Sequence, residues 1–295
     1  MNAFSKYHPI INFLFFAEVI GFSMFLMHPA ALLISLVCSF VYSACSDGSK
    51  TVMFSLKFNL PVMLAAAFIN PAFNHEGQTV LCYLPSGNPL TLESIFYGLA
   101  SAVMLSSVLL WFRSCTKIMT SDKFVYLFGR IIPSLSLVLS MSLRFVPKFA
   151  KQFEVVKDAQ QTAGKSVTDG NIFKRLKNAV KILSIMITWS LENAVETADS
   201  MKSRGYGLKG RTAFSVYRFK ERDSIALVWL LFCGIFILSG ILSGGLSWNY
   251  FPAMSGTVRQ PLTVCFLTVY LLLCLTPVFI DRTEERIWRS LKLKI

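Results

Sequence analysis

The chain has 295 residues, of which 54% are hydrophobic and only 15% are charged, and its mean hydropathy is +0.56. So little charge cannot cover a soluble globule, because about a quarter of the residues of a typical soluble domain are charged. The same composition excludes a disordered chain, a collagen and a small secreted disulfide scaffold. The apolar residues occur in blocks of about 20, the length of helix that crosses a bilayer. We therefore predict an all-α polytopic membrane protein with about six transmembrane helices.

The predicted membrane spans are apolar blocks that stand between polar residues. His28-Pro29 separates the first two blocks, because proline does not continue a helix comfortably. Asp47-Gly48-Ser49-Lys50 then returns the chain to the side on which it began. The six blocks lie near residues 10–27, 29–46, 52–70, 94–112, 224–245 and 262–280.

The basic residues are distributed unevenly along the chain, which has a formal net charge of +13. Residues 113–223 hold 20 Lys and Arg against 9 Asp and Glu, whereas residues 71–112 hold no basic residue. Short basic loops stay in the cytoplasm, so both termini and residues 113–223 are predicted to be cytoplasmic in a multi-pass protein of the cell membrane. This explains the charge better than nucleic-acid binding, and no nucleic-acid partner is expected. The expected division is N-terminal transmembrane helices at 1–112, a cytoplasmic region at 113–223, and transmembrane helices with a basic tail at 224–295.

Residues 124–147 are apolar enough to touch lipid but do not form a clear span. Pro133 interrupts the stretch, and Lys123, Arg130 and Arg144 bound its two halves. We predict two short helices at the membrane surface here.

Two amphipathic helices are predicted in the rest of the cytoplasmic region. The first follows Pro147 and stops at Gly164, and a second helix covers about 172–203, roughly 48 Å at the rise of an α-helix. Apolar residues spaced by three and four form a stripe on the second helix, and we expect this face to pack on another helix. The stripe is Ile172, Leu176, Ala179, Leu183, Ile187, Leu191, Ala194, Ala198 and Met201.

The second helix ends at Ser203-Arg204-Gly205. Glycine can adopt the left-handed conformation that ends helices, so the Arg204 side chain is predicted to project from the helix end. A guanidinium in that place can bind carbonyls or a carboxylate of another protein. It can equally cap the dipole of its own helix, and the spacing alone leaves both interpretations open.

These residues resemble the transmembrane T component of energy-coupling factor (ECF) transporters, the vitamin and metal importers also called the cobalt-transport permease family. The resemblance covers most of the chain, and the segment around Arg204 is its most specific part. The residues that carry it are Leu143-Arg144-Phe145-Val146-Pro147, Asp158-Ala159-Gln160 with Gly164, and Ala198 to Gly207 with Arg211-Thr212.

The resemblance implies a non-catalytic subunit that couples two ABC-type ATPases to a substrate-binding S component in the membrane. In the family, two long coupling helices each end in a small residue, an arginine and a glycine, and each docks on one ATPase. Ser203, Arg204 and Gly205 match the second of these motifs. Ala163 before Gly164 occupies the expected place of the first arginine, so either that dock lacks its ion pair or Lys165 substitutes for it. The supporting residues of the coupling region are Arg144, Pro147, Gln160, Tyr206 and Gly207.

Other candidate sites are weaker. The chain has no GxxxxGK[ST] loop and no GxSxG elbow, so it has no motif of its own for ATP binding or for a serine nucleophile. His75 has no partner histidine at ligand spacing, and neither a metal nor a cofactor is expected. Glu18 lies within the first apolar block, where an ion-coupling role and a structural role are both open. The alternative function is an intramembrane enzyme or a lipid-binding protein whose basic insertion binds anionic headgroups.

Overall fold

The computed structural model describes residues 3–83, 89–129, 133–165, 171–208, 217–256 and 260–292. The chain divides into two compact units. One, which we call the membrane unit, is Met1–Thr120 together with Tyr217–Ile295. The other, which we call the insertion unit, is Ser121–Val216.

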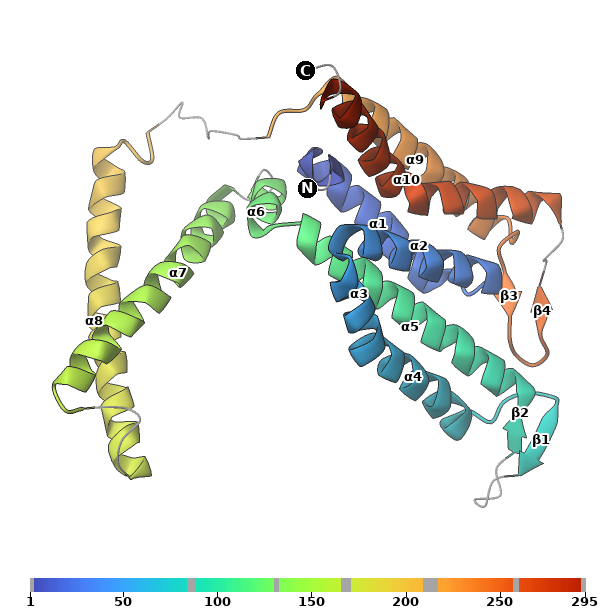
Figure 1. The fold of residues 1–295 in the computed structure, drawn as a ribbon, viewed down its shortest axis with the longest axis horizontal. Helices are drawn as coiled ribbons and strands as arrows, with labels where there is room; N and C mark the ends of the chain where they lie inside the picture. Colours follow the sequence, from blue (N-terminus) through green and yellow to red (C-terminus); the bar gives the residue numbers. More distant parts are fainter. Residues whose placement is uncertain are drawn as a thin grey trace. The chain divides into compact units, whose positions relative to one another are not determined.

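Helices make up nearly all of the membrane unit, and their order follows the chain (Figure 1). Short antiparallel hairpins pair β1 with β2 and β3 with β4. The helices are the 3₁₀-helix η1 (Ala3–Lys6), α1 (Pro9–Phe25), α2 (Pro29–Asp47), α3 (Ser49–Phe54), the π-helical turn η2 (Ser55–Asn59), α4 (Leu60–Phe73), α5 (Leu92–Ile118), α9 (Glu221–Leu242) and α10 (Pro261–Lys292). The strands are β1 (Val80–Tyr83), β2 (Pro89–Thr91), β3 (Trp248–Asn249) and β4 (Ser255–Gly256).

The insertion unit contains three helices among its described residues. These are α6 (Ser121–Gly129), α7 (Pro133–Thr162) and α8 (Ile172–Ser203). The prediction of a helix over 172–203 is therefore confirmed.

The all-α polytopic class is confirmed, with five candidate spans where about six transmembrane helices were predicted. Five helical stretches among the described residues are long and apolar enough to cross a membrane, with α3 to α4 forming one continuous stretch, and α1 is a shorter apolar helix of 17 residues. The predicted break at His28-Pro29 is confirmed, because α1 ends at Phe25 and α2 begins at Pro29. The last helix runs further than the predicted block and ends at Lys292.

The core of the membrane unit is formed by aromatic and aliphatic side chains from α1, α2, α5, α9 and α10. Phe15 of α1 packs edge-on against Trp111 of α5, with ring centroids 5.9 Å apart. Trp111 is fully buried, and its indole N–H donates to Ser35 Oγ of α2 at 3.1 Å. A buried indole N–H needs an acceptor, so this bond fixes α2 against α5.

The prediction for residues 124–147 is only partly correct. The first short helix is confirmed as α6, but residues after Pro133 do not form a second short helix. They belong to α7, a continuous helix of 30 residues that contains Pro147 in its interior. Pro133 begins this helix, a position where its missing N–H has no cost. Pro147 removes one backbone hydrogen bond, and the helical periodicity on both sides carries the helix through it.

Candidate functional site

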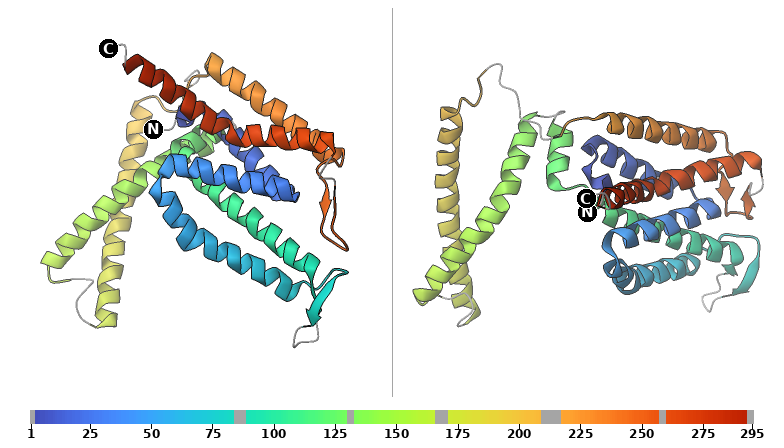
Figure 2. Two further views of the ribbon diagram at one scale, coloured as in Figure 1. Left: turned by 45° about the vertical axis from the view of Figure 1, so that its right-hand side comes forward. Right: turned by 45° about the horizontal axis from the view of Figure 1, so that its top comes forward.

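The candidate site is built on α7 and α8 of the insertion unit, which cross each other (Figure 2). Trp189 of α8 packs edge-on against Phe149 of α7, with ring centroids 5.3 Å apart. Two helical turns further along α7, Val156 is buried together with Ile182 and Met186 of α8. Contacts move to lower residue numbers in α8 as they move to higher numbers in α7, so the two helices are antiparallel.

A polar contact lies beside this apolar one. Lys148 Nζ of α7 donates to Asn193 Oδ1 of α8 at 2.6 Å. The same ammonium lies 5.5 Å from the ring centroid of Trp189, within the range of a cation–π interaction. The crossing point is therefore held by an ammonium, an amide and two aromatic rings, all within about one helical turn.

The apolar stripe predicted on α8 is not the face that packs on α7, and this prediction was wrong. Leu176, Leu183 and Leu191 of the stripe are each about 60% exposed, whereas Ile182 is only 2% exposed. The buried seam passes through Ile182 and Met186, one residue away from the stripe. One residue is about 100° around a helix, so most of the stripe faces away from the seam.

The end of α8 is closed by a Schellman motif. The N–H of Tyr206 donates to the carbonyl of Met201 at 3.0 Å, and the N–H of Gly205 donates to that of Lys202 at 2.9 Å. Gly205 has φ +75°, the left-handed conformation that the sequence predicted for it. Arg204 is the last residue before the reversal and is exposed.

The end of α7 has the same backbone pattern. The N–H of Lys165 donates to the carbonyl of Gln160 at 2.9 Å, and the N–H of Gly164 donates to that of Gln161 at 3.0 Å. Gly164 has φ +71°. Ala163 therefore occupies in α7 the position that Arg204 occupies in α8.

The residue before each of these positions is matched as well. Thr162 Oγ1 donates to the carbonyl of Ala159, and Ser203 Oγ donates to the carbonyl of Ser200, each at 2.9 Å. A short hydroxyl side chain that folds back on its own helix leaves the following residue as the first large group at the end. The two helix ends thus share a backbone and differ mainly in the side chain at Ala163 and Arg204.

Charge near the α7 end comes from lysines. The pKa of Lys181 lies below its usual value, first because the Lys165 side chain is within hydrogen-bonding reach and also because of the charges of Lys165 and Lys177. Lys165, Lys177 and Lys181 are all exposed. The α7 end therefore lacks a guanidinium but lies next to clustered ammonium groups from the start of α8.

The structure brings most of the sequence-predicted site residues into two helix ends. Ser203, Arg204, Gly205, Tyr206 and Gly207 form the end of α8, where Gly207 also has a positive φ of +91°. Ala163, Gly164 and Gln160 form the end of α7. Arg144 and Pro147 are exposed residues in the middle of α7, and Arg144 lies 19 residues before Ala163, about 28 Å along the helix. Arg130, Arg211 and Thr212 lie outside the described residues.

Sequence reasoning missed an apolar groove between the two helices. The groove has a volume of about 730 Å³ and is lined by Phe149 and Phe153 of α7 and by Leu183 and Ile187 of α8, among others. Part of the predicted stripe therefore faces this groove and not the packed seam. Apolar residues of α8 outside the stripe, among them Ile182, Ile185 and Met186, were the signal that could have indicated it.

Two other residues singled out by the sequence lie in the membrane unit. Glu18 of α1 lies against α9, where a Cβ added at Gly234 would come 2.8 Å from Glu18 Oε1. Its other oxygen, Oε2, is buried and makes no hydrogen bond among the described residues. His75 lies in the segment before β1, and the described residues contain no group of three or more His, Cys, Asp or Glu that could hold a metal ion.

Comparison with known proteins identifies the family. Residues 7–214, more than two thirds of the chain, match the family model described as cobalt transport protein, CbiQ. The chain belongs to this family.

Curated relatives carry names that agree with this family. The chain is 27% identical over 196 residues to the energy-coupling factor transporter transmembrane protein EcfT of Bacillus selenitireducens, covering 63% of this chain and 73% of that protein. It is 35% identical over 112 residues to the EcfT of Lacticaseibacillus paracasei, covering 38% of this chain and 40% of that protein. It is 32% identical over 108 residues to the EcfT of Lactococcus lactis subsp. cremoris, covering 36% of this chain and 41% of that protein.

Proposed function

We propose that this chain is the energy-coupling transmembrane subunit of an ECF-type ABC importer. In this role it transmits the ATP-driven motion of two ATPase subunits to a separate substrate-binding S component, and it catalyses no reaction itself. The observation that carries the proposal is the pair of matched helix ends at Ala163-Gly164 and Arg204-Gly205. The family match and the names of the relatives support it.

The end of α8 is the stronger of the two ATPase docks. Arg204 is exposed at the point where the helix reverses, so its guanidinium can reach carbonyls or a carboxylate on an ATPase surface. Such charge-assisted hydrogen bonds contribute about 1.5–3 kcal/mol each. Because the Schellman motif fixes the backbone around Arg204, a force that the ATPase exerts on the guanidinium is transmitted directly to α8.

The end of α7 docks on the second ATPase without an arginine. Its backbone matches that of the α8 end, so the shape of the dock is kept. Lys165 supplies a charge two residues later, but an ammonium cannot form the paired bonds of a guanidinium. The two docks are therefore unequal in strength.

The exposed apolar surface of α8 and the groove beside it are proposed to contact the S component. Leu176, Leu183 and Leu191 are about 60% exposed, and the groove is lined mainly by aromatic and aliphatic side chains. An exposed apolar surface of this kind marks an interaction site with protein or membrane. It also explains why the stripe is apolar although it does not pack on α7.

The insertion unit and both termini are assigned to the cytoplasm. The assignment rests on the distribution of Lys and Arg, since residues 113–223 hold 20 of the 29 basic residues of the chain. It places the helix ends on the side where ATP is available.

The alternative function, an intramembrane enzyme or a lipid-binding protein, is not favoured. The curated relatives are named as transporter components. Glu18 is an isolated acid in α1, and a catalytic pair at that depth needs a second group beside it.

Co-purification with the ATPases tests the proposal. The full chain is expressed with candidate ATPase subunits and an S component, isolated through a tag on this chain, and the ATPases are quantified. We expect both ATPases to co-purify with the wild type and the variant Arg204→Ala to retain at most about a tenth as much, a loss of about 1.4 kcal/mol or more.

A matched variant controls for loss of positive charge alone. Lys202→Ala removes a cation one residue from the end of α8 without touching Arg204 and is expected to leave ATPase recovery near that of the wild type. Equal recovery of ATPases with wild type and Arg204→Ala would contradict the proposed dock.

A further inference from the structure

Ion pairs in the described part of the chain are concentrated at two places. Five ion pairs are present there. At the second place, Arg222 and Asp223 also contact backbone carbonyl or N–H groups. Two ion pairs join the end of α5 to α2, and two lie at the start of α9. The fifth, between Arg289 and Glu285, is an exposed pair one turn apart within α10.

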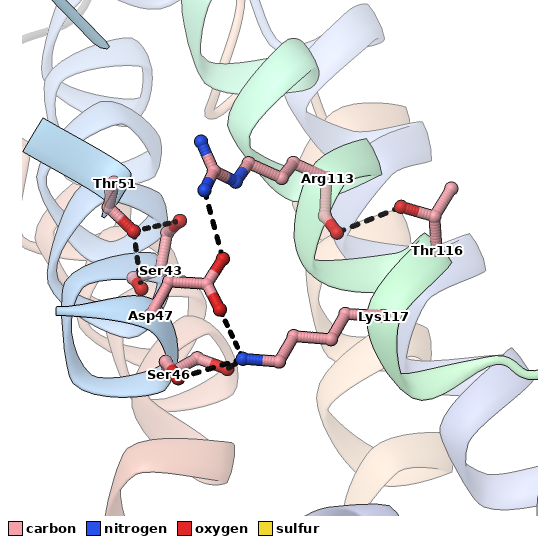
Figure 3. Close-up of polar contacts among 7 residues, drawn as sticks. All are labelled: Ser43, Ser46, Asp47, Thr51, Arg113, Thr116 and Lys117. Carbon is pink, nitrogen blue, oxygen red and sulfur yellow. Dashed lines mark hydrogen bonds and ion pairs between the residues drawn. The ribbon is translucent and has the colours of Figure 1, made fainter. Parts of the chain in front are cut away.

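The first place is the last two turns of α5, just before the chain enters the insertion unit at Ser121 (Figure 3). Arg113 and Lys117 lie one turn apart on α5, and both reach the carboxylate of Asp47 at the end of α2. Arg113 Nη2 donates to Asp47 Oδ2 at 3.0 Å, and Lys117 Nζ also donates to the Ser46 carbonyl at 2.8 Å. Asp47 and Arg113 are each only about one fifth exposed, so water screens this pair weakly.

The neighbourhood of Asp47 is itself held in place. The Arg113 guanidinium lies 4.4 Å from the ring centroid of Phe54 in α3. Thr51 Oγ1 donates to the carbonyl of Ser43 at 2.8 Å, across the break at Gly48 between α2 and α3 (Figure 3). The end of α5 is thus bound to both helices that meet at this break.

The second place is the start of α9, just after the chain returns to the membrane unit at Tyr217. Arg222 Nη2 donates to the carbonyl of Lys6 at 3.1 Å, and its guanidinium lies 4.9 Å from the ring centroid of Tyr7. Arg222 also pairs with Glu284 of α10 at 3.8 Å. The start of α9 is therefore bound to the segment before α1 and to α10.

The neighbouring acid completes this second cluster. Asp223 is 1% exposed, and its Oδ1 accepts the N–H of His8 at 3.4 Å while its Oδ2 accepts that of Lys220 at 2.9 Å. A buried carboxylate that accepts backbone N–H groups from two segments holds them at fixed separation.

We propose that these two clusters anchor both ends of the insertion unit to neighbouring membrane helices, so that movement of the insertion is passed to α1, α2 and α10. The α5 anchor is Asp47 with Arg113 and Lys117, and the α9 anchor is Arg222 and Asp223 with their partners. This inference rests on the proposed coupling function. Without the anchors, the last turn of α5 and the first turn of α9 bend away from their neighbours, and ATP hydrolysis is no longer converted into transport.

The test measures transport per ATP hydrolysed in the full complex. Wild-type complex is reconstituted in liposomes, and uptake is measured with a panel of radiolabelled B vitamins and cobalt(II). The compound that the wild type accumulates is then used for every variant. The variants Asp47→Asn and Arg222→Gln each remove one anchor while nearly keeping side-chain size, and Asp47→Glu keeps the charge.

We expect Asp47→Asn and Arg222→Gln to lower uptake per ATP at least about fivefold, the lower end of typical coupling effects, while ATPase recovery and ATP hydrolysis persist. Asp47→Glu is expected to recover most of the ratio. Arg289→Gln, which breaks the exposed pair in α10, is the matched control and is expected to have a wild-type ratio.

The outcomes distinguish failure of the anchors from failure of the proposed function. An unchanged ratio in both anchor variants overturns the anchors alone. So does a loss of ATPase recovery that matches the loss of uptake, because the pairs then serve assembly and not transmission. If the wild-type complex contains no ATPases or accumulates none of the compounds, the proposed function fails and the anchors with it.

Discussion

Arg204 and Ala163 differ by one side chain on the same backbone. Each precedes a glycine with a positive φ, and each helix end is closed by the same two hydrogen bonds. A difference in docking strength between the two ends should therefore depend on the side chain and not on the shape of the helix end. A substitution at Ala163 can therefore strengthen docking on the ATPase, whereas a substitution at Arg204 can weaken it.

The variant Ala163→Arg is predicted to strengthen ATPase binding. It places a guanidinium at the position equivalent to Arg204, and a single charge-assisted hydrogen bond contributes about 1.5 kcal/mol or more, roughly tenfold in affinity. The measurement is titration of detergent-solubilised chain with purified ATPase. Ala163→Leu, which adds bulk without charge, is the control. If Ala163→Arg binds the ATPase no more tightly than the wild type does, the ends of α7 and α8 are not equivalent docks.

Gly205 is predicted to be necessary for a well-formed α8 end. A non-glycine residue in the left-handed conformation costs about 1–2 kcal/mol, so Gly205→Ala should loosen the Schellman motif. Hydrogen exchange of the amides of residues 201–206 is expected to speed up about fivefold or more, the factor that corresponds to 1 kcal/mol. Gly21→Ala is the control, because Gly21 lies within α1 and a Cβ there meets nothing within 4 Å. Unchanged exchange in Gly205→Ala would show that the motif does not depend on glycine.

At the scale of the element, the crossing of α7 and α8 depends on a narrow seam. Ile182 is 2% exposed at this seam, whereas its neighbour Leu183 is 59% exposed. The variant Ile182→Ala is predicted to destabilise the α7–α8 contact by about 2–4 kcal/mol, because it leaves a cavity. Leu183→Ala is predicted to cost well under 1 kcal/mol, as is usual for exposed positions. Hydrogen exchange across residues 149–160 of α7 measures the difference, and equal effects of the two variants would place the seam elsewhere.

Sequence patterns identified the helices well but not the faces that they bury. Length and hydropathy predicted the spans, and Pro29, Gly164 and Gly205 marked helix ends because backbone conformation there is a local property. The packed face of α8 could not be predicted in the same way. Apolar residues surround much of that helix, and periodicity does not distinguish a stripe that contacts α7 from one that is left for other contacts.

Proline and paired charges show the same limit. The sequence predicts a helix boundary at Pro147, yet α7 continues through it. The contacts of Asp47 with Arg113 and Lys117 join residues about 70 positions apart, and nothing in their local sequence indicates them. Such features depend on tertiary packing, which a single sequence does not reveal.

At the scale of the whole molecule, the chain consists of a membrane unit and an insertion unit that are each compact. The membrane unit contains all five candidate spans found among the described residues, and the insertion unit carries both helix ends of the candidate site. Lipid embedding is thus assigned to one unit and ATPase docking to the other. In the assembled complex, the end of α8 is proposed to lie against an ATPase.

Site-specific photo-crosslinking tests that claim most directly. A photoreactive phenylalanine analogue is placed at Tyr206, which is 53% exposed beside Arg204, or at Phe25, which is 81% exposed at the end of α1. Illumination of the assembled complex is predicted to join position 206 to an ATPase subunit and to give no ATPase adduct from position 25. An ATPase adduct from position 25 with none from position 206 would contradict the account.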